Sequence, residues 1–230
     1  MLYVGNASPH PLSLPPRPSR PRRVFRDPWR QACHRVRARA PARRELRPGM
    51  DITLMHIRRA TTEADMAEVA AMWTRSSVRL RRKGLDQWQY PVKWENIRRS
   101  ASDLALWLAE DSEGRAVGTI TVSCQPDHYW LPSDNPTAAL YVHRMVIDDG
   151  FRGYELGSAM LDWAGRRARK AGKDWLRLDA WKSNPGLHRY YLDRGFSLVR
   201  IDTDPTDPSG ACFQRRATVE LGLGPEVVEA

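Results

Sequence analysis

A glycine-containing turn in the second half of the chain could bind a phosphate group. Residues 152–158 (RGYELGS) follow the apolar run 140–147 and open an amphipathic helix, which predicts a strand-to-helix turn. The first N–H groups of a helix lack intrahelical partners and lie at the positive end of its dipole, so a diphosphate can accept several hydrogen bonds there. Gly153 and Gly157 would let the ligand approach the main chain. Taken alone, the pattern is equally typical of an ordinary strand–turn–helix connection.

A second group of polar and aromatic residues, Asn184 to Phe196, decides between these interpretations. Here an asparagine precedes two tyrosines and a final Gly-Phe pair. Together the two segments resemble the GNAT family of N-acetyltransferases, whose signature is a hydrophobic strand, an Arg/Gln-x-x-Gly-x-Gly/Ala turn on a helix, a further strand, then Asn and Tyr before Gly-Phe. The match runs from about Leu140 to Phe196, and a looser one covers about 51–221. Glu155 stands where the family usually has its first glycine.

The resemblance implies an acetyl-CoA-dependent enzyme that moves an acetyl group to a primary amine by direct attack on the thioester. It also implies that the strands 141–147 and 175–181 part, so that the pantetheine arm pairs with exposed backbone of the first. Tyr191, four residues before Gly195, then matches the general acid that protonates the departing thiolate. Without this context, Tyr190 and Tyr191 would be read as packing residues of a short helix. The expected cofactor-binding residues are Met145, Val146, Ile147, Arg152, Gly153, Tyr154, Glu155, Leu156, Gly157, Ser158 and Asn184.

The general base has three candidates. His143 shares one face of the predicted strand with Tyr141, and serotonin N-acetyltransferase, a member of the resembled family, has histidine at both matching positions. Histidine side chains titrate near neutral pH, which suits a base, although a single histidine on a strand is more often structural. Asp179 on the next strand, or a chain of ordered waters, could serve instead.

The acceptor amine is not identified by the sequence. Trp88, Tyr90 and Trp130 could form an aromatic box for a cationic amine, with Tyr141 beside them, although core packing is an alternative in a chain with nine tryptophans. Two other functions stay open because fold resemblance does not select a substrate. One is a non-catalytic acetyl-CoA-binding regulatory module. The other is an acetyltransferase of a protein or of a substrate associated with nucleic acid.

The net charge of +10 lies entirely in the first fifty residues, which hold twelve arginines against Asp27 and Glu45. This segment also carries nine of the seventeen prolines, a composition typical of disorder. We expect 1–49 to be a disordered tail, upstream of the natural start because Met50 begins in the register of a first strand. A transit peptide and a nucleic-acid-binding arm are the alternatives.

The remaining composition indicates a cytoplasmic protein without metal. Cys33, Cys124 and Cys212 form no Cys-x-x-Cys pair, and the six histidines lack metal-ligand spacing, including the loop pair Asp127-His128. No apolar run is long enough to span a membrane. The partners we expect are acetyl-CoA and an amine acceptor, in a monomer or homodimer, and the neutral domain argues against nucleic acid.

The predicted elements form an α+β fold with a mixed, mostly antiparallel sheet of about seven strands and helices on both faces. The domain is expected over 50–222, followed by a C-terminal tail, 223–230. The basic run 79–83 is read as the solvated last turn of the first helix rather than as an anion site. Strands are predicted at 52–58, 104–109, 116–124, 140–147, 175–181, 196–201 and 212–221, with helices from 61 to 83, 94 to 99, 155 to 172 and up to 193.

Overall fold

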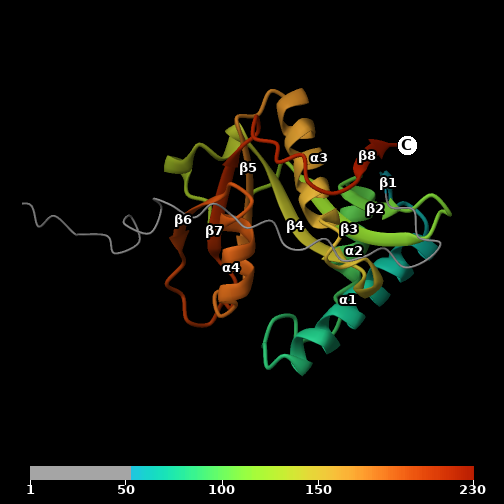
Figure 1. The fold of residues 1–230 in the computed structure, drawn as a ribbon. Coiled ribbons are helices and arrows are strands. Elements are labelled where there is room, and N and C mark those ends of the chain that lie inside the picture. The colour runs from blue at the N-terminus through green and yellow to red at the C-terminus, as the bar shows by residue number, and fades with distance from the viewer. Residues whose placement is uncertain (1–52) are drawn as a thin grey trace, which may run out of the picture. The chain divides into compact units, whose positions relative to one another are not determined.

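The computed structural model describes residues 53–230, which contain one eight-stranded sheet (Figure 1). The expectations for residues 1–49 lie outside the described residues. The strands are β1 (Leu54–Arg59), β2 (Leu106–Glu110), β3 (Ala116–Ser123), β4 (Ala139–Ile147), β5 (Trp175–Ala180), β6 (Ser197–Ile201), β7 (Ala211–Arg216) and β8 (Glu226–Glu229). Their order across the sheet is β6-β7-β5-β4-β3-β2-β1-β8. Neighbours are antiparallel except for β4–β5 and β1–β8, so the predicted mixed, mostly antiparallel α+β sheet is confirmed.

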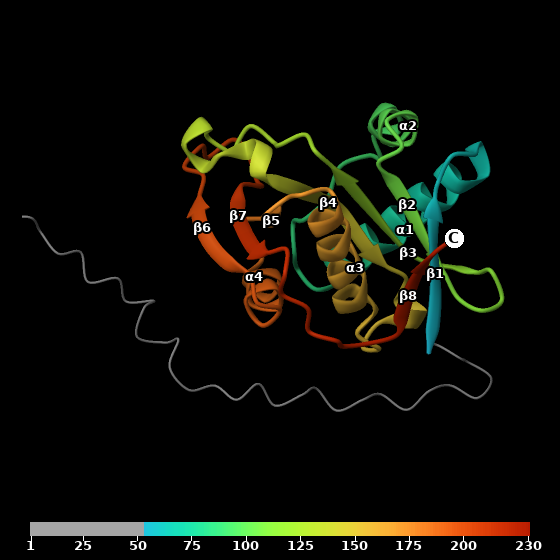
Figure 2. The same ribbon diagram turned by 90° about the horizontal axis from the view of Figure 1, so that it is seen from above.

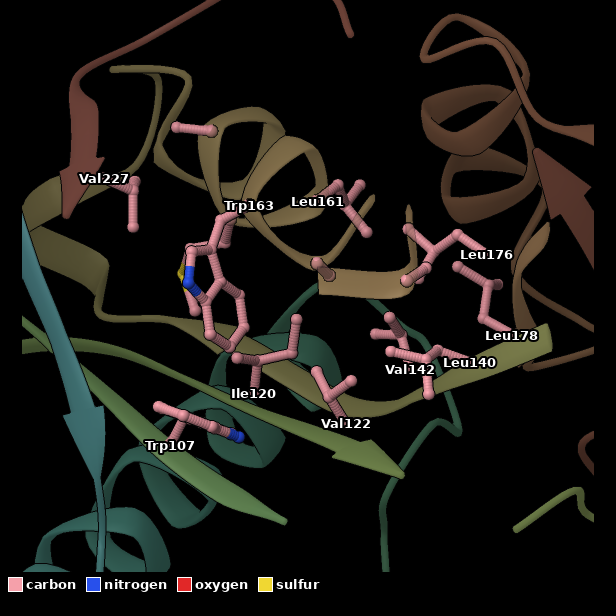
Figure 3. Packing of buried hydrophobic residues seen from close by; sticks show 14 of the residues in the cluster. Trp107, Ile120, Val122, Leu140, Val142, Leu161, Trp163, Leu176, Leu178 and Val227 are labelled. Carbon is pink, nitrogen blue, oxygen red and sulfur yellow. The ribbon is translucent and has the colours of Figure 1, made fainter. Parts of the chain in front are cut away.

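Helices cover both faces of the sheet (Figure 2). They are α1 (Glu63–Arg82), α2 (Trp94–Ser102), α3 (Leu156–Lys170) and α4 (Pro185–Leu192), with the short 3-10 turns η2 (Pro132–Asp134), η3 (Pro136–Ala138) and η4 (Asp149–Phe151). Successive side chains of β2 point to opposite faces of the sheet, so they pack against different helices. Leu106 and Leu108 pack with α1 and α2, whereas Trp107 packs edge-on against Trp163 of α3 (Figure 3). None of these helices, within residues 53–230, could cross a bilayer.

The first helix begins at a capping box formed by Thr62 and Asp65. The hydroxyl of Thr62 accepts a hydrogen bond from the Asp65 N–H at 3.1 Å, and the Asp65 carboxylate accepts one from the Thr62 N–H at 3.0 Å. This reciprocal arrangement satisfies two N–H groups that a helix start leaves unpaired. The apolar stripe of α1 is buried at Met66, Val69 and Ala70, and it holds the helix against the sheet.

A bulge in β4 lies where this strand parts from β5. Along β3, Thr119 pairs with Val146 and Thr121 with His143, so β4 carries one extra residue in this interval. Arg144, inside the bulge, has a left-handed φ of 49°. The ladder with β5 runs only from Ala139 to Val142 of β4, so the rest of this strand, 143–147, diverges from β5.

The C-terminal residues form a strand, and the expectation of a tail at 223–230 is wrong. Strand β8 pairs in parallel with β1, with Leu54 opposite Glu226. The segment leading to it passes the start of α3, where a Cβ at Gly224 would lie 2.5 Å from the carbonyl oxygen of Glu155. The sequence pattern of β8 does not stand out as a strand because the element has four residues, of which only Val227 is buried.

A buried ion pair holds the same segment against α3. Arg215 donates to Asp162 at 3.0 Å, and both side chains are almost fully buried. The second carboxylate oxygen of Asp162 accepts from the N–H groups of Leu221 and Gly222 at 2.8 and 3.0 Å. The side chain thus satisfies a guanidinium and two main-chain donors at once.

Candidate active site

A cavity of about 470 Å³ lies where β4 diverges from β5. The end of β4, the start of α3, the helix α4 and the last turn of α1 contribute to its walls. Most of the residues predicted to bind the cofactor come together here, and Tyr154 and Ser158 are the two that do not line it. Those that line it are Met145, Val146, Ile147, Arg152, Gly153, Glu155, Leu156, Gly157 and Asn184.

Glu155 adopts the conformation that the family's glycine would take without strain. Its φ is 59° and its ψ is 18°, in the left-handed region that costs a non-glycine residue roughly 1–2 kcal/mol. Its carboxylate turns toward α4, where it accepts hydrogen bonds from Arg194 at 2.6 Å and from Ser158 at 2.5 Å. Arg194 also donates to the Ser158 hydroxyl at 2.6 Å. This network neutralises the carboxylate and fixes the turn, so the departure from the family pattern leaves the turn formed.

Gly157 is required by the close approach of Tyr190. A Cβ at this position would overlap the Tyr190 hydroxyl. The Arg194 guanidinium stacks over the Tyr190 ring at 3.6 Å from its centroid, which limits how far the tyrosine can move. Leu156 and Gly157 line the cavity and precede Ser158, whose N–H forms the first helical bond, to Glu155 at 2.9 Å. The start of α3 is therefore a main-chain surface suited to an anion.

Tyr191 lines the cavity from a buried position. Its ring packs against Phe196 and Phe213, with centroids 5.6 and 5.7 Å away, and the residue is 7% exposed. Burial raises the pKa of the Tyr191 hydroxyl above its ordinary value, so the phenol stays protonated at neutral pH. A protonated phenol on the wall of the cavity can donate a proton to a bound group.

Asn184 lines the cavity, but its side-chain amide is already engaged. Its oxygen accepts from the Leu187 N–H at 3.0 Å and so caps α4. Its nitrogen donates to the Gln87 side chain at 2.7 Å, and the residue is buried. The contacts indicate that Asn184 positions α4 and the loop before α2 around the cavity, a role that the sequence did not suggest.

His143 belongs to a cluster with two carboxylates. Its Nδ1 lies 2.9 Å from an Asp127 oxygen and its Nε2 lies 3.2 Å from the Ser123 hydroxyl. Asp179 of β5 completes the cluster, in which one potential ligand atom of each of His143, Asp127 and Asp179 lies within 4.8 Å of the others. These are ligand types that metals use, but the hydrogen bonds within the cluster already employ both ring nitrogens. Asp127 was missed because it was read as plain loop.

The two carboxylates of this cluster differ in acidity. Burial and the negative charge of Asp127 raise the pKa of Asp179 to about 6, and the Ser209 hydroxyl donates to the same carboxylate. Although burial opposes it, the hydrogen bond with His143 lowers the pKa of Asp127. The cluster can therefore hold or release one proton in the neutral range.

Of the expected aromatic box, Trp88 and Tyr90 line one cavity together, whereas Trp130 lies elsewhere in the core. Trp130 and Tyr141 are buried against each other in a cluster of their own, with ring centroids 5.8 Å apart. Alternation along β4 turns Tyr141 under the loop that carries Trp130, which makes both of them core residues. Tyr90 is 47% exposed and its ring lies 6.3 Å from that of Trp181 just after the end of β5, a residue that no motif marks. Trp88 also lines the cavity of about 470 Å³.

The basic end of α1 also lines the cavity, contrary to the expectation of a solvated turn. Arg79 and Lys83 contribute to the same walls as Arg152. The signal was present in the sequence, since residues four apart lie on one face of a helix. The sequence does not show which elements of the fold lie opposite this face of α1.

Comparison with known proteins agrees with this geometry. Residues 102–198 match a family model described as an acetyltransferase (GNAT) domain. The N-acetyltransferase YesJ of Bacillus subtilis (strain 168), itself uncharacterised, is 22% identical over 143 residues, 60% of this chain and 79% of that protein. A GNAT-family acetyltransferase from Listeria monocytogenes has a TM-score of 0.58 at 19% identity, covering 70% and 93% of the two chains.

A second solved structure extends the comparison to a complex. It is that of yncA from Salmonella typhimurium with its cofactor acetyl-CoA, and it has a TM-score of 0.51 at 16% identity, covering 74% and 97% of the two chains. The fold and the family model together define a class of acyltransferases. Residues 102–198 match the GNAT acetyltransferase domain and the chain has the fold of solved GNAT acetyltransferases, so the resemblance seen in the sequence is confirmed.

Proposed function

We propose that the protein transfers the acetyl group of acetyl-CoA to a primary amine by direct attack of the amine on the thioester. The observation that carries the proposal is that one cavity is lined by a free strand edge, a helix start and a protonated phenol. In the reaction a C–N bond forms and the C–S bond breaks. The amine gives a proton to a base, and the thiolate takes one from an acid.

The cofactor would be bound by two main-chain surfaces. Residues 145–147 continue β4 beyond its ladder with β5, so the pantetheine amides can pair with them as an added strand. An N–H group in this segment, which we assign to Val146, would polarise the thioester carbonyl. The turn from Arg152 to Ser158 would hold the diphosphate at the start of α3.

Tyr191 and the histidine cluster would move the two protons. Tyr191 would donate to the thiolate, because burial keeps its hydroxyl protonated. We assign the base to the cluster of Asp127, His143 and Asp179 rather than to His143 alone, since both ring nitrogens of His143 already have partners. Above about pH 6 Asp179 is ionised and can accept a proton from the ammonium form of the acceptor.

The acceptor would approach past Tyr90 and Trp181. Their rings lie 6.3 Å apart, and a cationic amine is attracted to aromatic faces. The carboxylates of the cluster, on β5 and in the loop after β3, would favour the same charge. A regulatory module without activity is disfavoured, because Arg194 neutralises the Glu155 carboxylate that would weaken the turn.

The test combines cofactor binding with turnover. The purified full chain is titrated with CoA by calorimetry and incubated with acetyl-CoA and a panel of primary amines, with release of the CoA thiol and the mass of the acetylated product as readouts. Gly157→Asp should abolish binding, because its Cβ displaces Tyr190 and its carboxylate repels the diphosphate that we place at this turn. Gly114→Asp is the control for the added charge, since it lies in a surface turn with no atom within 4 Å, and its left-handed φ of 76° is one that aspartate adopts more readily than most residues. The proposal fails if the wild-type protein acetylates no amine, and CoA binding without transfer would favour the regulatory module instead.

A further inference from the structure

The cavity carries more positive charge than the glycine turn supplies. Four cationic side chains and one carboxylate line it, and the carboxylate, Glu155, is paired with Arg194 at 2.6 Å. The three others are Arg79 and Lys83 from the last turn of α1 and the turn residue Arg152. Elements about seventy residues apart in the sequence thus bring three cationic side chains to one cavity, and among the described residues the ion pair with Asp149 offsets the charge of Arg79 alone.

Arg79 is partly buried, and its Nε–H has no hydrogen-bond partner among the described residues. Its two terminal nitrogens donate to Asp149 and to the Ser76 hydroxyl, both at 2.5 Å, and its side chain is 20% exposed. The unpaired Nε itself is buried. Buried donors of this kind are rare in proteins, and they commonly bond to a ligand or to an ordered water.

The charge environment of Arg79 points the same way. Burial, together with the nearby positive charge of Arg152, lowers the pKa of Arg79. The guanidinium nevertheless stays ionised, because the ordinary pKa of arginine lies far above neutral pH. A negative group between Arg79 and Arg152 would replace this repulsion with two attractions.

The end of α1 is tied to the segment that leads into the turn. Arg75 donates to Asp148 at 2.8 Å and Arg79 donates to Asp149, so two ion pairs connect α1 with η4. Lys83, one turn beyond Arg79, is exposed, and its ammonium can reach a ligand in the cavity. The wall opposite the start of α3 is therefore positioned before any ligand binds.

We propose that Arg79 and Lys83 of α1, together with Arg152, form a second phosphate-binding wall, so that phosphate groups of CoA are held between α1 and the start of α3. The inference rests on the proposed function only for the identity of the ligand. CoA offers phosphate at its diphosphate and at its 3′ position, and the charges on α1 suit either group. Guanidinium and ammonium groups bind phosphate through strong charge-assisted hydrogen bonds.

Calorimetry with three ligands tests this assignment on the full chain. The variants are Arg79→Gln and Lys83→Gln, with Arg82→Gln as the matched control, because Arg82 is exposed on the same turn and does not line the cavity. The ligands are CoA, dephospho-CoA and pantetheine, which lacks every phosphate. We expect each cavity variant to weaken CoA binding about tenfold, the loss typical of one hydrogen bond to a charged group. Pantetheine binding and the control should be unchanged.

Comparison of the three ligands shows which phosphate group of CoA the side chains bind. An equal loss with dephospho-CoA assigns the diphosphate, whereas a loss seen only with CoA assigns the 3′-phosphate. CoA binding at the wild-type level in both cavity variants would refute the second wall while leaving the proposed function intact. An equal loss with pantetheine would also refute it, since the side chains would then act on the shape of the cavity. Absence of CoA binding by the wild-type protein would overturn the proposed function itself.

Discussion

Replacing Tyr191 by phenylalanine separates its chemical role from its packing role. The substitution removes one oxygen and leaves the ring against Phe196 and Phe213, whose centroids are 5.6 and 5.7 Å away. The free energy of unfolding should therefore change by no more than about 1 kcal/mol, as for the loss of a single neutral hydroxyl. CoA affinity should hold as well, because the turn 152–158, where we propose that the diphosphate binds, is untouched.

Tyr191→Phe should affect the rate of acetyl transfer much more than the free energy of unfolding. Loss of one positioned acid typically costs 10²–10⁴ in rate, which corresponds to about 3–5 kcal/mol in the barrier. Single-turnover acetyl transfer, followed by release of the CoA thiol, measures this step without interference from product release. Burial raises the pKa of Tyr191, so the wild-type rate should decline only above the ordinary phenol range near about pH 10.

Tyr190→Phe is the matched control for this prediction. Tyr190 also lines the cavity, but its ring is stacked under Arg194 and its hydroxyl lies against Gly157. Its loss should lower the single-turnover rate far less than that of Tyr191. The reasoning is refuted if Tyr191→Phe transfers the acetyl group at the wild-type single-turnover rate, because Tyr191 would then serve packing alone.

Two further predictions concern buried charges. Because Asp179 ionises near pH 6, kcat/KM should fall as the pH drops through this value, and Asp179→Asn should remove this pH dependence. Ionisation of the buried Asp179 should also lower the folding stability of the wild-type protein as the pH rises from about 4 to about 6, and the same variant should remove this loss of stability. Asp162→Asn should lower the urea-determined free energy of unfolding by about 3–5 kcal/mol, since it leaves Arg215 buried and unpaired, whereas Asp193→Asn in the exposed pair with Arg189 should cost less than about 1 kcal/mol. Similar losses in the free energy of unfolding for Asp162→Asn and Asp193→Asn would contradict this ranking.

Local signals predicted the parts of the site that depend on neighbouring residues. Thr62 and Asp65 specify the cap of α1 by a spacing of three, and the turn 152–158 follows from glycines between a strand and a helix. The order of strands and helices gave the fold class for the same reason. Each of these features is decided within about ten residues of chain, where hydrogen-bond and periodicity rules apply.

The features that were missed depend on contacts between distant segments. Asp127 meets His143 only because a loop folds back beside β4, and Glu155 is accommodated by Arg194, 39 residues further on. Trp130 and Tyr141 were assigned to the acceptor site because an aromatic residue type does not reveal whether it lies in a wall or in the core. Strand β8 is too short for its pattern to stand out beside two glycines and a proline.

The pairing of β8 with β1 has a consequence for how the protein folds during synthesis. Leu54 cannot meet Glu226 until the ribosome has made and released nearly all of the domain, and contacts of such long sequence separation form late and slowly. Gly224, on the way into β8, packs on the main chain of Glu155. A nascent chain that already holds α3 would therefore lack support for the turn 152–158, and the edge of β1 would stay open to pairing with other chains until β8 is added.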